Sequence, residues 1–139
     1  MVVEARGCIG YEVRVERLKT DINSWKHKLK DFINYSDNVD IVIKFLENKA
    51  SLGRIFYKEK IIELDPRFTL IQLRKTLIHE LIHYEQYVDK RLEIKEGEWF
   101  WNGVHYENTL QYDSYKKLPW EIEARKRSKE ITNKLFNIY

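Results

Sequence analysis

Two histidines one helical turn apart, with a glutamate next to the first, are the residues of this chain best suited to chemistry. His79, Glu80 and His83 lie in the segment "TLIHELIHYEQY", residues 76–87. A spacing of four residues brings two imidazoles to the same face of a helix, close enough for both to bind one Zn²⁺. Glu80, about 100° round the helix, can hold a water beside the metal without binding the metal itself. The pattern predicts a zinc site with Glu80 as general base.

The surrounding residues predict the helix that carries this pattern. On a helical wheel one continuous apolar stripe lies nearly opposite both histidines. It consists of Leu70, Leu73, Leu77, Leu81, Tyr84 and Val88. A second apolar flank consists of Ile71, Ile78 and Ile82. We expect a central helix whose histidine face is turned toward a cleft. The alternative is a core helix whose two histidines bind no metal.

A third ligand must be found elsewhere, because a catalytic zinc site commonly takes three protein ligands and leaves one position for water. The extended pattern with a third histidine needs glycine at 86 and histidine at 89, where this chain has Gln86 and Asp89. That class of zinc site is therefore excluded. The remaining histidines, His27 and His105, lie in segments expected at the surface.

Glu121 and Glu123, in the segment "LPWEIEAR", are the carboxylate candidates for the third ligand. The expected buried face of this helix consists of Trp120, Ala124, Ile131 and Leu135. Glu121 falls nearer the centre of that face than Glu123 does. We expect Glu121 to be the ligand and keep Glu123 as the alternative. Both could instead only stabilise the helix N-terminus, where negative charge is favourable by about 0.3–1 kcal/mol.

Strands are predicted by the alternation of apolar and polar residues. The strongest pattern covers residues 39–45, and a weaker one covers residues 11–15. Residues 52–57 and 60–64 are rich in strand-forming residues and flank a charged turn, which indicates a hairpin. Asn102-Gly103 predicts the turn of another hairpin, over residues 98–107, because both residues tolerate a positive φ.

Helices are predicted in three places. One begins at Thr20 or Asp21 and carries an apolar stripe through residues 22–33. The histidine helix follows Pro66 and is capped by Thr69, and the last helix begins at Pro119. Together with the strands, these helices predict an α+β fold in which a small mixed sheet packs on the histidine helix and on a C-terminal glutamate helix.

The composition limits the other function classes. A chain of 139 residues with 43% hydrophobic content suits one domain, residues 1–139. Basic and acidic residues, 25 against 22, are spread along the chain, so nucleic-acid binding is not indicated. No apolar run approaches the roughly 20 residues that span a bilayer. The single cysteine, Cys8, and the absence of a leader-like start predict a cytoplasmic protein.

The histidine motif and the distant glutamate together resemble the motif of a known group of enzymes. His79-Glu80-Leu81-Ile82-His83, followed 38 positions after His83 by Glu121 in a Glu-x-x-Ala context, resembles the gluzincin clan of zinc metallopeptidases. The small size is similar to that of its minimal members, the minigluzincins and related phage- and prophage-type proteins. The resemblance covers about residues 39–135. Many gluzincins have Asp or Asn after the small residue of the glutamate helix, where this chain has Arg125. The residue that supports a ligating histidine is therefore unassigned.

The resemblance implies a zinc-dependent endopeptidase acting on peptides or proteins. Water activated by zinc would attack the peptide carbonyl while Glu80 takes its proton and passes it to the leaving amine. Tyr112, Tyr115 and His105 are candidates for stabilising the developing negative charge. The segment at residues 52–57 resembles the edge strand that pairs with an extended substrate in this clan.

Other hypotheses stay open at this stage. Trp99, Phe100 and Trp101 form either a substrate wall or flap, or ordinary hairpin packing. The thiolate of Cys8 could bind the zinc and keep the enzyme latent. The alternatives to a peptidase are a zinc-stabilised protein-binding module without activity, and a protease acting on DNA-bound proteins like the SprT-like families. The sequence pI of about 8.8 slightly favours the latter. The sequence gives no indication of the oligomeric state.

Overall fold

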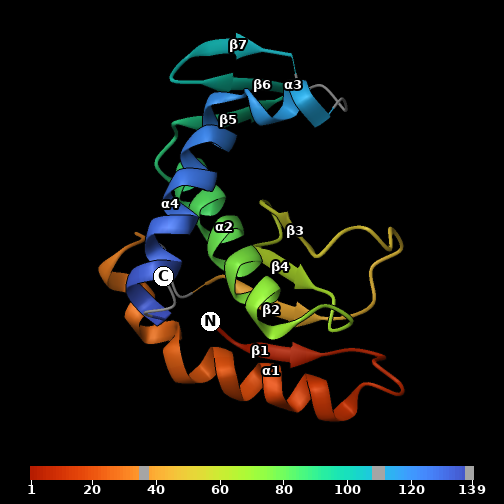
Figure 1. Cartoon of the computed structure of the whole chain (residues 1–139). Helices are drawn as coiled ribbons and strands as arrows, with labels where there is room; N and C mark the ends of the chain where they lie inside the picture. The colour runs from red at the N-terminus through yellow and green to blue at the C-terminus, as the bar shows by residue number, and fades with distance from the viewer. Residues whose placement is uncertain (35–37, 108–111, 137–139) are drawn as a thin grey trace.

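The chain folds into an α+β structure with the histidine helix at its centre (Figure 1). The computed structural model describes residues 1–34, 38–107 and 112–136. A four-stranded mixed sheet packs against the helices, and a three-stranded antiparallel sheet lies beyond the C-terminal end of the central helix. The predicted fold class, a small mixed sheet packed on two helices, is therefore confirmed.

The larger sheet has the strand order β1-β2-β4-β3. Its strands are β1 (Val3–Ala5), β2 (Asp40–Ile43), β3 (Gly53–Phe56) and β4 (Ile61–Leu64). β1 and β4 pair with β2 in parallel, whereas β3 pairs with β4 in an antiparallel hairpin. The strand predicted within residues 39–45 and the hairpin predicted at residues 52–64 are confirmed. β3 forms one edge of this sheet.

The N-terminal segment differs from its prediction, because residues 11–15 begin a helix and not a strand. α1 (Glu12–Trp25) runs through this segment, and the short 3-10 helix η1 (Lys26–Asp31) follows. Val15 is buried, while Val13 is 72% exposed. Later buried residues of α1 continue the stripe of Val15 at helical spacing: Leu18, Ile22 and Trp25. A run of five alternating residues was too short to distinguish a strand from an amphipathic helix.

Asp21, expected to cap this helix, lies inside it. Its carboxylate accepts a hydrogen bond from Trp25 Nε1 at 2.8 Å and another from Arg74 Nε at 2.9 Å. Arg74 belongs to the central helix, so this ion pair joins the central helix to α1. Asp21 thus ties two helices together and does not start one.

The central helix, α2 (Leu70–Val88), begins with the predicted cap at Thr69. The Gln72 backbone N–H donates to Thr69 Oγ1 at 3.2 Å, and Thr69 N–H donates to Gln72 Oε1 at 3.0 Å. This capping box satisfies two backbone groups that the first turn leaves without a partner. Most of the predicted stripe is buried, namely Leu73, Leu77, Leu81 and Tyr84, whereas Val88 at the end of the helix is 44% exposed.

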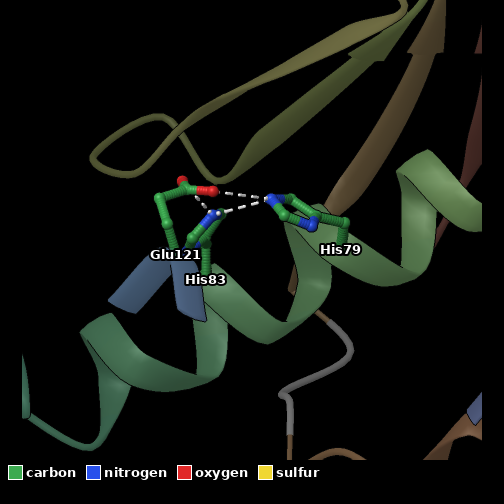
Figure 2. Close-up of side chains that lie close together, drawn as sticks. All are labelled: His79, His83 and Glu121. Carbon is green, nitrogen blue, oxygen red and sulfur yellow. Dashed lines mark hydrogen bonds and ion pairs between the residues drawn. The ribbon is translucent and has the colours of Figure 1, made fainter. Parts of the chain in front are cut away.

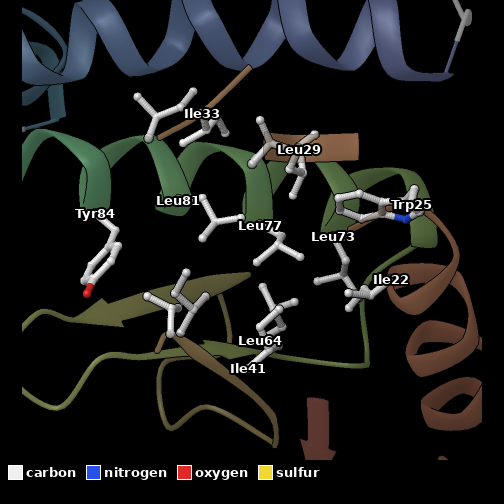
Figure 3. Close-up of a cluster of buried hydrophobic side chains, with 14 of the residues drawn as sticks. Ile22, Trp25, Leu29, Ile33, Ile41, Leu64, Leu73, Leu77, Leu81 and Tyr84 are labelled. Carbon is white, nitrogen blue, oxygen red and sulfur yellow. The ribbon is translucent and has the colours of Figure 1, made fainter. Parts of the chain in front are cut away.

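α2 lies between the larger sheet and α4 (Pro119–Phe136), as Figure 3 shows. Leu77 and Leu73 point from α2 toward Ile41 and Leu64 of the sheet. Burying each such side chain stabilises the fold by about 1.5–3 kcal/mol. On the other side of α2, Ala124 of α4 is fully buried in the same core, which lets the two helices approach closely.

The smaller sheet closes the C-terminal end of α2. It consists of β5 (Leu92–Lys95), β6 (Glu98–Trp101) and β7 (Val104–Tyr106), in that order. The predicted hairpin is confirmed, since Asn102 and Gly103 have φ of 50° and 82° at its turn. The Trp99 ring stacks on Trp120 at 5.7 Å, which attaches this sheet to the start of α4. The short helix α3 (Tyr112–Lys116) precedes α4.

None of the helices within the described ranges combines the length and the apolar composition of a membrane-spanning segment.

Candidate metal centre

His79, His83 and Glu121 meet at the contact between α2 and α4 (Figure 2). One donor atom from each lies within 4.8 Å of the other two. His83 Nε2 is 2.8 Å from Glu121 Oε1, and His79 Nε2 is 3.3 Å from Glu121 Oε2. The two Nε2 atoms are 3.1 Å apart. We call these three residues the metal cluster, because their converging donors could hold a metal ion.

The metal cluster is enclosed on one side and open on the other. Glu121 is 1% exposed and His83 is 4% exposed. The His79 side chain is 21% exposed. A bound ion would therefore be reached from the side of His79.

Glu121 Oε2 is a buried acceptor whose hydrogen-bonding capacity is not used by the described residues. This oxygen is buried and accepts no hydrogen bond from the described part of the chain, whereas Oε1 accepts one from the Tyr115 hydroxyl. Leaving a buried acceptor unsatisfied costs roughly 1–3 kcal/mol, and more when the acceptor is charged. Two imidazoles and a carboxylate are also the donor set of many catalytic zinc sites. The residues present therefore fit a divalent cation.

Gln86 fixes the orientation and the tautomer of His83. Its Nε2 donates to the Trp120 carbonyl oxygen at 3.0 Å, and its Oε1 lies 2.8 Å from His83 Nδ1. A carbonyl oxygen can only accept, so the amide nitrogen of Gln86 must face Trp120 and its oxygen must face His83. Nδ1 of His83 then carries the proton, and Nε2 is left to bind a metal.

This role of Gln86 was not predicted from the sequence. The residue lies three positions after His83 on the same helix and is fully buried. Residues three apart on a helix are neighbours, so a polar side chain at this spacing was a usable signal for the histidine support. Gln86 is therefore the residue that supports His83, for which the sequence had indicated no candidate.

Burial and hydrogen bonding act in opposite directions on the pKa values of the cluster. Burial raises the pKa of Glu121, but its close contacts with His79 and His83 and the hydrogen bond from Tyr115 outweigh it and hold that pKa well below its ordinary value. Burial lowers the pKa of His83, but its bond to Glu121 and the charge of Glu80 outweigh this and raise it. Metal binding needs a neutral imidazole, so a metal would compete with the proton that this raised pKa favours.

Glu80 lies beside the metal cluster and is not one of its converging donors. Its side chain is half-buried, and it lines the hollows on both sides of the cluster. Burial raises the pKa of Glu80, even though His83 and His79 lower it. A carboxyl group whose pKa is raised is better suited to both accept and return a proton.

An open cleft of about 760 Å³ adjoins the cluster on the side of the N-terminal half of α2. On the other side lies a hollow of about 290 Å³. Four residues line both, namely Gly53, Glu80, Tyr115 and Glu121. The two hollows therefore adjoin each other at the metal cluster, and we refer to them together as the cleft.

Gly53 lets the edge strand β3 lie close to α2 along this cleft. A Cβ atom at this position would be 2.8 Å from the Glu63 carbonyl oxygen and 2.9 Å from both Leu64 Cδ2 and Thr76 Cγ2. Any larger residue would therefore displace backbone or core atoms. The segment expected to be an edge strand does lie beside the cleft, and its pairing with a substrate stays a prediction.

Of the three candidates for charge stabilisation, the structure brings Tyr115 to the cluster. Its hydroxyl donates to Glu121 Oε1, and burial together with this bond raises its pKa. His105 lies on β7 with its ring 2.5 Å from Glu98, and it is not among the described residues that line the cleft. Tyr112 begins α3, but its side chain lies outside the part of the chain that the structure describes.

Glu123, the alternative ligand, has other partners. Its Oε2 accepts a hydrogen bond from Arg91 at 2.6 Å, and its Oε1 accepts one from Gln86 at 3.2 Å. The converging donor set therefore contains Glu121 and not Glu123.

The remaining sequence candidates lie in different places. Trp99 lines the smaller hollow. Trp101 packs near Trp120 and Arg91, and Phe100 packs against His105. The thiol of Cys8 lies 3.4 Å from the Ile43 carbonyl oxygen, and Cys8 lines a separate hollow. Trp99 is thus the hairpin aromatic that the structure places at the cleft.

No protein family model, curated protein or solved structure matches this chain. The resemblance to the gluzincin clan therefore depends on the motif residues alone.

Proposed function

We propose that this chain is a zinc-dependent endopeptidase. The observation that carries the proposal is the convergence of His79, His83 and Glu121 at an open cleft, with Glu80 beside them. Structural zinc sites are usually closed by four protein ligands, whereas catalytic sites keep one position open. Three ligands at an accessible cleft support a hydrolytic site over a purely structural one.

The proposed reaction assigns a separate task to each residue. When bound, Zn²⁺ supplies a Lewis acid that lowers the pKa of a water molecule from 15.7 toward about 7. Glu80 accepts the proton of the attacking water and then returns it to the leaving amine. Gln86 keeps His83 in the tautomer that can bind metal, and Tyr115 holds the carboxylate of Glu121 in place.

A peptide substrate is supported by the position of β3. The strand lies at the edge of the larger sheet and beside the cleft. An extended peptide can add to such an edge through main-chain hydrogen bonds, which would align a peptide bond with the metal cluster. Because the cleft continues on both sides of the cluster, it accommodates residues on both sides of the cleaved bond, as an endopeptidase requires.

The test combines zinc analysis with cleavage of casein and a peptide library. We expect the wild type to bind one zinc and to cleave. Glu80→Gln should keep its zinc and lose about 10²–10⁴-fold in turnover. Glu59→Gln makes the same chemical change at an exposed position between β3 and β4 and should leave turnover unaltered. A zinc-loaded wild type that cleaves nothing would contradict the proposal and favour the binding module.

A further inference from the structure

The two parts of the cleft differ in charge. The larger hollow, which we call the cationic arm, is lined by Lys75, Arg125 and Lys129. The smaller hollow, which we call the aromatic arm, is lined by Tyr57, Trp99 and Trp120. A substrate that passes the metal cluster would therefore meet cations on one side and aromatic rings on the other.

The cations of the cationic arm lie on the same helix faces as the metal cluster. Lys75 precedes His79 by one turn of α2, or about 6 Å along the helix. Arg125 and Lys129 follow Glu121 by one and two turns of α4. Because Lys75 and Lys129 line the same hollow, α2 and α4 run in opposite directions past the cleft (Figure 1). The positive charge therefore begins beside the cluster, at Arg125, and continues along both helices to Lys75 and Lys129.

Little negative charge offsets these cations. Among the described residues that line the cationic arm, the acidic ones are Glu80 and Glu121, which belong to or adjoin the metal cluster. Arg125 Nε lies 3.8 Å from Glu121 Oε2 and is partly engaged there. Lys75 and Lys129 are exposed. The arm is thus both positively charged and accessible to a ligand.

The aromatic arm provides the contrast. The described residues that line it include one cation, Arg54, whose guanidinium group bonds to Glu63 at 2.6 Å and Glu47 at 3.1 Å. Its wall is held in place by the stacking of Trp99 on Trp120. A charged group on this side of the cluster would gain little from Arg54, because two carboxylates already neutralise it.

We propose that the cationic arm selects peptides with a carboxylate one to three residues from the cleaved bond, on one side of that bond only. The inference rests on the proposed endopeptidase function and specifies its substrate class. An extended chain rises about 3.3 Å per residue, so cationic residues that begin one turn, or about 6 Å, along the helices from His79 and Glu121 lie beside side chains at these positions. The carboxylate belongs to an Asp or Glu side chain or to the C-terminus of the peptide, since both present the same charged group.

Matched peptides test this selection. One cleavable sequence carries Glu, Gln or Lys at each of three positions on either side of the cleaved bond, and each peptide is made with a free and an amidated C-terminus. A single exposed ion pair changes affinity by a factor of about 1.4–5, and several cations act together here. We expect kcat/KM for Glu to exceed that for Gln at least fivefold on one side, and to differ less than twofold on the other. A preference that disappears on amidation identifies the C-terminus as the source of the carboxylate.

Charge reversal tests the residues. Lys75→Glu/Lys129→Glu should invert the preference, so that Lys peptides are cleaved faster than Glu peptides. Lys28→Glu/Lys126→Glu changes the net charge equally at exposed positions outside the described lining of the cleft and should keep the preference for Glu. Zinc-loaded Glu80→Gln should bind the same peptides in the same order, measured by fluorescence anisotropy without turnover.

The outcomes separate this inference from the proposed function. Cleavage of all peptides at equal rates, or an unchanged preference in Lys75→Glu/Lys129→Glu, would overturn the inference and leave the endopeptidase function intact. If the zinc-loaded protein neither cleaves nor binds any of the peptides, the proposed function fails, and the inference fails with it.

Discussion

Two polar clusters lie between α2 and α4, and each contains a buried glutamate from one of these helices. The first is the metal cluster, built around Glu121. The second, which we call the guanidinium cluster, consists of Glu85, Arg91, Glu123 and Arg127. Glu85 is 6% exposed and Glu121 is 1% exposed, so burial alone does not distinguish them.

The number of donors distinguishes the two carboxylates. Glu85 accepts hydrogen bonds from Arg127 Nη1 at 2.5 Å, from Arg91 Nη2 at 3.3 Å and from the Asn34 backbone N–H at 2.6 Å. Glu121 keeps one buried oxygen without a hydrogen bond from the described residues. A buried carboxylate with a full set of donors stabilises the fold, whereas one that lacks a donor and faces two imidazoles is suited to bind a cation.

The largest difference is expected when each glutamate is removed. Glu121→Ala should weaken zinc binding more than about 100-fold, because the loss of a ligand exceeds the 10–100-fold cost of losing a support. Glu85→Ala should leave zinc affinity within about threefold of the wild type and should lower the free energy of unfolding instead. Chelator competition measures the first quantity and urea denaturation the second. Equal zinc affinity in the two variants would abolish the distinction.

Gln86 joins the two clusters, because its side chain bonds to both His83 and Glu123. Gln86→Leu keeps a similar volume and removes these bonds. We expect zinc affinity to fall by about 10–100-fold, as is usual for residues that orient a ligating histidine. Gln72→Leu makes the same chemical change in the capping box of α2 and is the matched control: it should lower the free energy of unfolding but leave zinc affinity unaltered.

Removing a hydrogen-bond donor from the guanidinium cluster should lower the stability of the fold. Arg127→Leu leaves Glu85 with fewer donors, and we expect the free energy of unfolding to fall by about 1–2 kcal/mol. This is less than the usual 3–5 kcal/mol for a fully buried pair, because the Arg127 side chain is 26% exposed. The double change Glu85→Leu/Arg127→Leu should recover part of this loss, since it leaves no unpaired charge. If the double variant is less stable than Arg127→Leu, the ion pair itself provides the stability.

Asp65, like Glu85, is a buried carboxylate with several hydrogen-bond donors, and we expect its substitution to have the smallest effect on stability. It is fully buried at the end of β4 and accepts bonds from the Leu46 and Arg67 backbone N–H groups and from the Arg67 side chain. Burial raises the pKa of Asp65, but these bonds outweigh it and lower that pKa below its ordinary 3.8. The ionised form thus contributes stability above about pH 3.8, and this contribution is lost as the pH falls through the lowered pKa.

The corresponding measurement is the stability difference between the wild type and Asp65→Asn. We expect about 1 kcal/mol at neutral pH, by analogy with other single hydrogen-bonding changes, and a decrease toward zero under acid conditions. A difference that stays constant down to pH 2 would show that the charge of Asp65 plays no part.

The elements that could be predicted from the sequence are those with a local signal. The cap at Thr69 before α2, the Asn-Gly turn and the proline at the start of α4 each depend on a few neighbouring residues. Glu121 was preferred to Glu123 because helix periodicity places it nearer the buried face of the last helix. That face of α4 does pack against α2 in the structure.

What the sequence did not reveal depends on long-range contacts. β1 forms by parallel pairing with β2, across an intervening helix, and its three residues carry no pattern of their own. β5 was missed as well, because its position depends on the hairpin with which it pairs. The absence of a hydrogen bond to Glu121 Oε2 in the described part of the chain could not be predicted either, because it depends on how side chains from α2 and α4 meet.

The most direct test of the account is diffraction from zinc-loaded crystals at the zinc absorption edge. We expect one anomalous peak at about 2.0–2.2 Å from His79 Nε2, His83 Nε2 and a carboxylate oxygen of Glu121. A peak elsewhere on the protein, or a zinc that either histidine or Glu121 does not contact, would contradict it.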